Sequence, residues 1–394
     1  MKPLEGVLVA DFSRVLAGPM SAQILADFGA RVVKIERPGI GDETRSWEPR
    51  LKKDSGYFFA FNRGKESITL DLKSEDGKEI ARDIAAKADV LLENFPVGQM
   101  AKLGLDYDRL KEVNPRLIYV SNTGFGQFGP NSHKVGYDTV FQAMGGMMSL
   151  TGEKDGGPAK AGLPVADLTS GLWLAIAALT GLVGRGVSGR GCRIDVSMMD
   201  IQVSLLTIAA ARFFALGEAP KREGTEHPGR VPSAAFQCAD GEWLQISASD
   251  QHWLPLCEFF GLEDLATRDD LATNSGRVRN RKLVSASLKA AISKRPRKDV
   301  IKGLEARRVP VGPVNSVDQI LEDENTKARN MIGSFEYPEV GPFPALRNPL
   351  LLEGFDNPAI SPPPTLGQQS QSILSGLLGY DADRVRDLTA KGVV

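Results

Sequence analysis

Cysteine and histidine are scarce in this 394-residue chain, which contains three of each. The cysteines, Cys192, Cys238 and Cys257, show no CxxC spacing. This argues against a disulfide scaffold and a cysteine-rich zinc site, and it is typical of a reducing compartment. The histidines form no HExxH motif, which excludes the zinc site built on that motif. We therefore expect no metal site.

Neither sign of charge dominates, because 48 lysines and arginines face 49 aspartates and glutamates. This balance argues against a nucleic acid or an anionic membrane as partner. The longest uncharged apolar stretch, residues 168–184, is shorter than the roughly 20 residues that span a bilayer, and it predicts a buried core helix. Glu5 and Asp11 interrupt any apolar N-terminal segment. No signal peptide is therefore predicted, and the cytoplasm is the expected location.

The first 122 residues alternate between strand and helix patterns, within a chain that is 42% hydrophobic and 25% charged, as in globular proteins. This alternation predicts an α/β fold with a largely parallel sheet. Ligands bind such sheets outside the carboxyl ends of the strands. The predicted strands are residues 6–12, 32–35, 67–72, 90–95 and 117–121, and the predicted helices are 18–29 and 75–86, the latter capped by Ser74.

A second region follows a predicted long helix over residues 200–216. Residues 218–229 are charged and contain Gly and Pro, which indicates a linker. A predicted hairpin over 235–247, with an Asp-Gly turn, comes before helices between about 253 and 306. The tail is rich in proline and then returns to a short helical pattern.

Three glycines, Gly124, Gly126 and Gly129, match GxGxxG after a predicted strand. A dinucleotide site would need a helix to open at the third glycine, but Pro130 and Asn131 follow and favour a turn. A loop over a site is therefore predicted in place of a nicotinamide or flavin site. No Walker motif and no GxSxG motif occurs in the chain.

Asp167 comes just before the apolar stretch and has two interpretations. It is either the N-cap of the predicted helix or a reactive group. A helix start favours the anionic form of a carboxylate, and such a carboxylate can attack a carbonyl carbon to form an acyl intermediate. Tyr137 and Asp138, from a segment rich in glycine and methionine, either pack in a helix and turn or project into a pocket.

Five cations follow the predicted strands and are either solvated surface groups or a converging site for a phosphorylated ligand. They are Arg14, Arg37, Arg45, Lys73 and Lys102.

The chain resembles the class III CoA-transferases, also called the CaiB–BaiF family, over nearly its whole length. So many matches in the same order along the chain are highly specific for this family. The segments that carry the resemblance are LEGVLVADF (4–12), AGP (17–19), VKIE (33–36), GDETR (41–45), FNRGK (61–65), LDLK (70–73), ENF (93–95), TGFGQFGP (123–130), GYD (136–138), Asp167, GRG (189–191), DVSM (195–198) and LG (366–367).

This resemblance implies a Rossmann-like large domain with a smaller α+β domain, in a homodimer of two interlocked, ring-like chains. The implied division is residues 1–200 for the large domain, 201–224 for a linker helix, 225–325 for the small domain and 326–394 for a segment that returns to the large domain.

The resemblance also implies CoA transfer from an acyl-CoA donor, such as succinyl-CoA, to a free carboxylic acid, with acyl-CoA as substrate and no tightly bound cofactor. Asp167 matches the catalytic aspartate, which forms an aspartyl mixed anhydride and then an aspartyl-CoA thioester. Backbone N–H groups of a glycine-rich loop or a helix start would stabilise the developing oxyanion, each by roughly 3–4 kcal/mol.

The same resemblance implies the residues that bind CoA. Arg37, Lys73 and Lys102 match positions for its phosphates, and Leu70, Asn94 and Phe95 match positions near its adenine and pantetheine. Arg14, where some relatives have His, is expected to contact CoA or an acceptor carboxylate, and Tyr137 and Asp138 are further candidates. A dicarboxylate acceptor, for instance succinate, mesaconate, itaconate or glutarate, would need a cation from Arg14, Arg45 or Arg230.

Two alternatives to transfer stay open. The related α-methylacyl-CoA racemases have Gly-His-Asp where this chain has Gly136, Tyr137 and Asp138. Racemisation needs two acid/base groups, and tyrosine, with a pKa near 10, is a poorer partner than histidine. The sequence therefore favours CoA transfer over racemisation. The other alternative is a non-catalytic protein that binds acyl-CoA.

Overall fold

The computed structural model describes residues 1–394 and divides into two compact units. Residues 148–160, which the sequence analysis leaves in the large domain, group with the second unit. The reason is local pairing, because Arg222 donates a hydrogen bond to the Gly156 carbonyl (2.7 Å) and Lys154 pairs with Glu223 (3.2 Å). The first unit consists of Met1–Met147, Ala161–Ala211 and Glu324–Val394, and the second of Met148–Lys160 and Arg212–Asp323.

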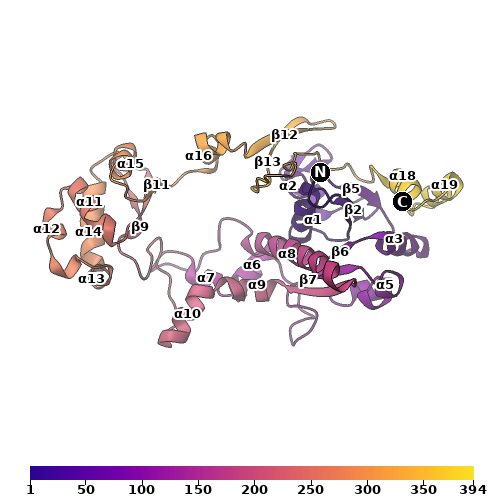
Figure 1. Cartoon of the computed structure of the whole chain (residues 1–394), viewed down its shortest axis with the longest axis horizontal. Helices are drawn as coiled ribbons and strands as arrows, with labels where there is room; N and C mark the ends of the chain where they lie inside the picture. Colours follow the sequence, from indigo (N-terminus) through magenta and orange to yellow (C-terminus); the bar gives the residue numbers. More distant parts are fainter. The chain divides into compact units, whose positions relative to one another are not determined.

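A six-stranded, wholly parallel sheet forms the centre of the first unit (Figure 1). This confirms the predicted α/β class with a parallel sheet. The four central strands are buried along nearly their whole length, because helices cover both of their faces. In spatial order the strands are β5 (Glu66–Thr69), β2 (Arg31–Glu36), β1 (Leu8–Asp11), β6 (Val90–Glu93), β7 (Ile118–Thr123) and β8 (Cys192–Ser197).

Helices pack on both faces of this sheet. On one face, α1 (Ala17–Asp27) and α8 (Val165–Ser188) share a core with Val9 and other residues of one strand parity. On the other face, α3 (Glu75–Lys87) and α5 (Tyr107–Val113) share a core with the alternate residues, Ala10 among them. The predicted cap of α3 is confirmed, since the Ser74 hydroxyl accepts a hydrogen bond from the Gly77 N–H (3.0 Å).

The predicted buried core helix is longer and less buried than expected. It is α8, which has 24 residues because Val165–Asp167 and Arg185–Ser188 also take helical conformation. It is the one straight helix long and apolar enough to cross a membrane, and 44% of its most apolar window is buried. Small residues such as Ala177 and Ala178 face the sheet, whereas Trp173, Ile176 and Val187 are exposed.

The C-terminal segment completes the first unit. Its hairpin, β12 (Ile332–Tyr337) and β13 (Gly341–Leu346), packs against α2 (Gly56–Phe61). Further on, the Gly367 N–H donates to the Ser67 hydroxyl of β5 (2.9 Å), and the Tyr380 hydroxyl donates to Asp83 of α3 (2.5 Å). Its last helices, α18 (Ser370–Ser372), η3 (Ile373–Leu377) and α19 (Ala382–Ala390), are yellow in Figure 1.

The second unit has a small antiparallel sheet, β11–β10–β9, covered by helices. The predicted hairpin is confirmed, and Gly241 in its turn has φ +82°. The predicted helix over 200–216, which begins in the first unit, is in fact two helices, α9 (Met198–Leu205) and α10 (Thr207–Leu216), bent by 62°. The sheet and its helices are β9 (Ser233–Gln237), β10 (Trp243–Ser247), β11 (Val311–Pro313), α11 (Asp250–Phe260), α12 (Glu263–Ala266), η2 (Asp269–Leu271), α13 (Asn274–Arg279), α14 (Arg281–Ile292) and α15 (Arg297–Glu305).

Short elements connect these parts, and several of them bear on the site. They are η1 (Glu43–Ser46), β3 (Arg50–Leu51), β4 (Asp54–Ser55), α4 (Gln99–Leu103), α6 (Asp138–Met144), α7 (Met147–Leu150), α16 (Val317–Leu321) and α17 (Glu324–Ala328).

Candidate active site

Two adjoining cavities lie where the loops that follow β1, β2, β5, β6 and β7 meet. The first has a volume of about 270 Å³ and the second about 650 Å³. Both are lined by Arg14, Glu43 and Phe95, so they adjoin each other in the first unit. Their place at the carboxyl ends of parallel strands is the one that the sequence predicts for a ligand.

The first cavity brings together residues that were predicted to bind the phosphates, the adenine and the pantetheine of CoA. Leu70 is buried in its wall, and Arg37 and Lys73 are exposed at its edge. Lys102 lies on α4, whose residues Gln99 and Leu103 line this cavity. Lys102 itself is exposed and lines neither cavity. Its role in binding phosphate stays a prediction.

The loop between β1 and α1 separates the two cavities and has a strained backbone. Val15 has φ +70°, a region that β-branched residues rarely adopt. The Asn94 side chain holds this loop, since it accepts a hydrogen bond from the Arg14 N–H (2.8 Å) and donates one to the Arg14 carbonyl (2.7 Å). The Arg14 guanidinium pairs with Glu43 (2.6 Å) and lies over the Phe95 ring, 5.1 Å from its centre. Asn94 and Phe95 thus fix where Arg14 lies.

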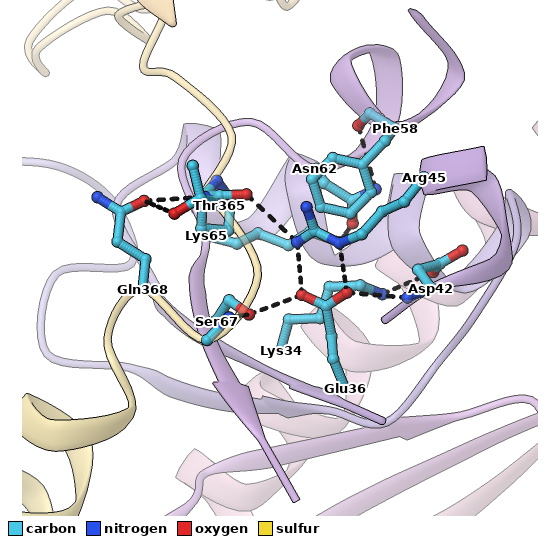
Figure 2. A network of polar contacts seen from close by, with 12 residues as sticks. Lys34, Glu36, Asp42, Arg45, Phe58, Asn62, Lys65, Ser67, Thr365 and Gln368 are labelled. Atoms are coloured by element: carbon cyan, nitrogen blue, oxygen red, sulfur yellow. Dashed lines mark hydrogen bonds and ion pairs between the residues drawn. The ribbon is translucent and has the colours of Figure 1, made fainter. Parts of the chain in front are cut away.

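A buried polar network supports the loop after β2 (Figure 2). Arg45 donates two hydrogen bonds to Glu36 (2.8 and 2.7 Å) and one to Asp54 (2.6 Å), and it stacks on Phe58 at 3.6 Å. Burial opposes ionisation of Glu36, but the hydrogen bonds and the charge of Arg45 outweigh this effect. The pKa of Glu36 is therefore lowered. The prediction that Arg45 reaches a ligand is therefore wrong, because its guanidinium is buried and committed to these two carboxylates.

A second buried ion pair lies under β1. Lys65 donates hydrogen bonds to Asp11 and Asn62, both at 2.9 Å, and its side chain is fully buried, as is that of Asp11. Burial lowers the pKa of Lys65 to about 8, partly offset by the charge of Asp11. This pair ties the residue before β5 to the end of β1.

Asp167 lies in the first turn of α8, in the wall of the second cavity. It is the third residue of the helix, and Pro164 occupies the N-cap position, so the interpretation of Asp167 as an N-cap is wrong. Burial, and then the nearby charge of Asp138, raise the pKa of Asp167 to about 7. The sequence argument considered only the helix start, which favours the anionic form. In the folded chain, burial and the charge of Asp138 outweigh the effect of the helix start on the pKa of Asp167.

Asp138 is the residue that caps α8, from 26 positions before the N-cap residue Pro164. One carboxylate oxygen accepts hydrogen bonds from the N–H groups of Ala166 (2.7 Å) and Asp167 (3.2 Å), and the other from the Gln142 amide (2.6 Å). Asp138 is buried and lines neither cavity, in contrast to its predicted contact with the ligand. Tyr137 does line the second cavity and is 70% exposed.

The GxGxxG segment runs from β7 to α6 as bends and turns, which confirms the predicted loop. Gly124 lines the second cavity, and a side chain there would collide with the Phe141 ring, 2.4 Å from an added Cβ. The sequence analysis did not single out His133 and Lys134, which also line this cavity. Turn-forming residues nearby indicated a loop over a site, but nothing in the sequence indicated which of the loop's residues would line the cavity.

Comparisons with known proteins agree with this architecture. Residues 4–370 match the sequence model of CoA-transferase family III. The chain is 37% identical over 399 residues to the succinyl-CoA:glutarate CoA-transferase of Mus musculus, covering 100% of this chain and 91% of the mouse protein. It is 39% identical over 376 residues to the acetyl-CoA:oxalate CoA-transferase of Acetobacter aceti, covering 94% and 95%. A crystal structure of a CAIB/BAIF family protein from Brucella suis has a TM-score of 0.85 at 39% identity, covering 95% of this chain and 99% of that chain.

Proposed function

The chain belongs to CoA-transferase family III, and on that premise we propose that it transfers CoA from an acyl-CoA to a dicarboxylic acid through Asp167. One observation carries the proposal. A carboxylate in the first turn of α8 lines the second cavity, of about 650 Å³, which adjoins the first cavity with its cations at the sheet edge. The relatives named succinyl-CoA:glutarate and acetyl-CoA:oxalate CoA-transferase support a dicarboxylate as acceptor.

The first step forms an acyl-aspartyl anhydride. An oxygen of ionised Asp167 attacks the thioester carbonyl carbon, the C–S bond breaks, and CoA leaves as a thiolate. Negative charge builds on the carbonyl oxygen and needs N–H donors. The N–H groups of Ala166 and Asp167 already donate to Asp138. The loop that begins at Gly124, in the cavity wall, would supply such donors.

The next steps move CoA onto the protein and then onto the acceptor. The CoA thiolate attacks the aspartyl carbonyl carbon, which releases the donor acid and leaves an Asp167–CoA thioester. An acceptor carboxylate attacks this thioester and expels the thiolate, and a second anhydride forms. The thiolate then attacks the acceptor carbonyl, so that acyl-CoA leaves and the Asp167 carboxylate is restored. No net proton, electron or water is consumed.

The two cavities suit the two ends of CoA. Arg37 and Lys73 at the first cavity would bind phosphates, beside apolar Leu70 and Phe95 for the adenine and pantetheine. In the second cavity the acceptor's remote carboxylate would meet Arg14, whose side chain is 41% exposed. Arg230 belongs to the second unit, and Arg45 is committed elsewhere.

An interlocked homodimer is part of the same proposal. The outer face of α8 exposes Trp173 (46%), Ile176 (47%), Val183 (72%) and Val187 (89%). An apolar surface of this kind favours contact with another protein surface, and we expect sedimentation to give the mass of two chains. A cytoplasmic location stays a prediction from the three free cysteines.

The proposal is tested with succinyl-CoA and acetyl-CoA as donors against a panel of mono- and dicarboxylic acids, with products identified by mass spectrometry. Hydroxylamine added with the donor alone should trap an aspartyl hydroxamate at Asp167. Exchange of the substrate α-hydrogen for deuterium without any acceptor would instead indicate a racemase. Tight binding of acyl-CoA with no turnover on any acid would indicate a non-catalytic protein.

We expect Arg37→Ala to raise the KM of the acyl-CoA donor roughly 10- to 100-fold and to leave kcat nearly unchanged. A hydrogen bond to a charged group contributes about 1.5–3 kcal/mol, and contacts with phosphate hold substrate and transition state equally. Lys73→Ala should behave in the same way. Steady-state kinetics check this, with Lys87→Ala, at the exposed end of α3, as the control. An unchanged KM in both variants would exclude the first cavity as the phosphate site.

A further inference from the structure

Asp138 is a buried carboxylate that the reaction steps above do not use. All three of its hydrogen-bond partners are donors, namely two backbone N–H groups of α8 and the side-chain amide of Gln142. The Asp138 carboxylate therefore accepts hydrogen bonds through both of its oxygens. Because the Asp138 side chain is only 8% exposed, this charge is held in place and is poorly screened by solvent.

Gln142 fixes Asp138 in turn. Its amide nitrogen also donates to the Leu163 carbonyl (3.3 Å), and its oxygen accepts from the Ala161 N–H (2.9 Å). These contacts connect α6 to the segment that leads into α8. The N-cap residue of α8, Pro164, makes no side-chain cap of its own. The position of the first turn of α8 therefore depends on Asp138 and Gln142, and Asp167 lies in that turn.

We propose that Asp138 is a positioning residue for Asp167: it fixes the backbone that bears the reacting carboxylate and places a second negative charge beside it. This inference rests on the proposed role of Asp167 and adds two effects. The cap keeps the carboxylate at the cavity wall. The neighbouring charge repels ionised Asp167, and this repulsion disappears in the anhydride and the thioester, which are neutral. Acylation of Asp167 is thereby favoured over the free carboxylate.

The other charged and titratable groups around Asp167 do not replace this charge. Arg14, in the loop after β1, lines the same cavity as Asp167, but its guanidinium pairs with Glu43 of η1. From the segment before α6 come His133, Lys134 and the hydroxyl of Tyr137. The Asp138 carboxylate is the one that accepts a hydrogen bond from the Asp167 N–H.

The test compares pH profiles of kcat/KM. In the wild-type enzyme kcat/KM should rise as the pH rises through about 7, since Asp167 must lose its proton to attack. In Asp138→Asn, which keeps an oxygen for the two N–H groups, this acid limb should move to lower pH. It should stay above the usual range of an aspartate, because burial still raises the pKa of Asp167. An acid limb at the wild-type pH in Asp138→Asn would overturn the proposal.

A second variant separates positioning from stability. Asp138→Ala removes the cap and should lower kcat on the order of 100-fold, because small displacements of a reacting group are costly, with the donor KM within a few-fold of wild type. The matched control is Asp381→Ala, which removes the aspartate that caps α19 by accepting from the Arg384 N–H (2.8 Å). It should lower thermal stability without lowering kcat. Wild-type kcat in Asp138→Ala would contradict the positioning role, whereas full activity in Asp167→Ala would contradict the proposed function itself.

Discussion

Replacing Asp167 with alanine is expected to abolish CoA transfer, with a fall in kcat on the order of 10⁴-fold or more. The alanine variant has no oxygen to accept the acyl group, so neither anhydride nor thioester forms. Steady-state assays should show this loss, and the hydroxylamine reaction should yield no modified residue. Asp167→Asn is a weaker test, because asparagine can deamidate to restore the carboxylate.

A matched control exists in the next helix. Asp200 is the third residue of α9, as Asp167 is of α8, but it is exposed and lines neither cavity. Asp200→Ala should therefore keep activity within a few-fold of wild type. Loss of activity in both variants to the same degree would indicate damage to the fold and not loss of a nucleophile.

The same position should also reveal a conflict between activity and stability. Since folding raises the pKa of Asp167 to about 7, ionisation of this residue favours the unfolded state. Asp167→Asn should thus have a larger free energy of unfolding than wild type at pH 8. This excess should be absent near pH 3.8, grow as the pH rises toward 7, and stay constant above it. Urea denaturation at several pH values measures it.

The second large effect is expected at Arg45. Arg45→Leu should destabilise the protein by about 3–5 kcal/mol, because it leaves the buried carboxylates of Glu36 and Asp54 without their partner. The donor KM should rise as well, since Glu36 also accepts from the Asp42 N–H (2.9 Å) and both residues line the first cavity. Urea denaturation and steady-state kinetics check the two effects.

A surface arginine of β2, the strand that also contains Glu36, provides the comparison. Arg31 of β2 pairs with Glu66 at 2.9 Å, but the two side chains are 42% and 30% exposed. Arg31→Leu should cost no more than about 1 kcal/mol. If unpaired carboxylates cause the loss in Arg45→Leu, then adding Glu36→Gln and Asp54→Asn should recover part of it. No recovery would assign the loss to packing against Phe58.

The sequence predicted the central strands and their helices well, and a physical reason explains this. Strands of a buried parallel sheet are largely apolar, so the first three residues of β6 (Val90–Glu93) and of β7 (Ile118–Thr123) are visible as short apolar runs. Caps such as Ser74 act on N–H groups two or three residues away, and turns such as that at Gly241 need a residue that tolerates positive φ. Each of these signals depends only on nearby residues.

The site was predictable only in part for the opposite reason. The loops after the strands were expected to meet, since the ends of parallel strands lie at one sheet edge, and Arg14, Arg37, Leu70 and Lys73 do line the cavities there. The fate of each polar group in those loops was not predictable. Nothing in the sequence distinguishes Arg45 from the other cations, yet in the structure Arg45 is buried in an ion pair with Asp54.

The amino-acid sequence by itself determined the order of strands and helices and the position of Asp167 at the start of an apolar helix. Only the tertiary structure decided that Asp138, and not a neighbour of Asp167, caps that helix and accepts a hydrogen bond from the Asp167 N–H. Hydrophobic periodicity and local capping depend on residues a few positions apart. The burial and charge that set the pKa of Asp167 depend on groups brought together by the fold, and their separation along the chain gives no sign of it.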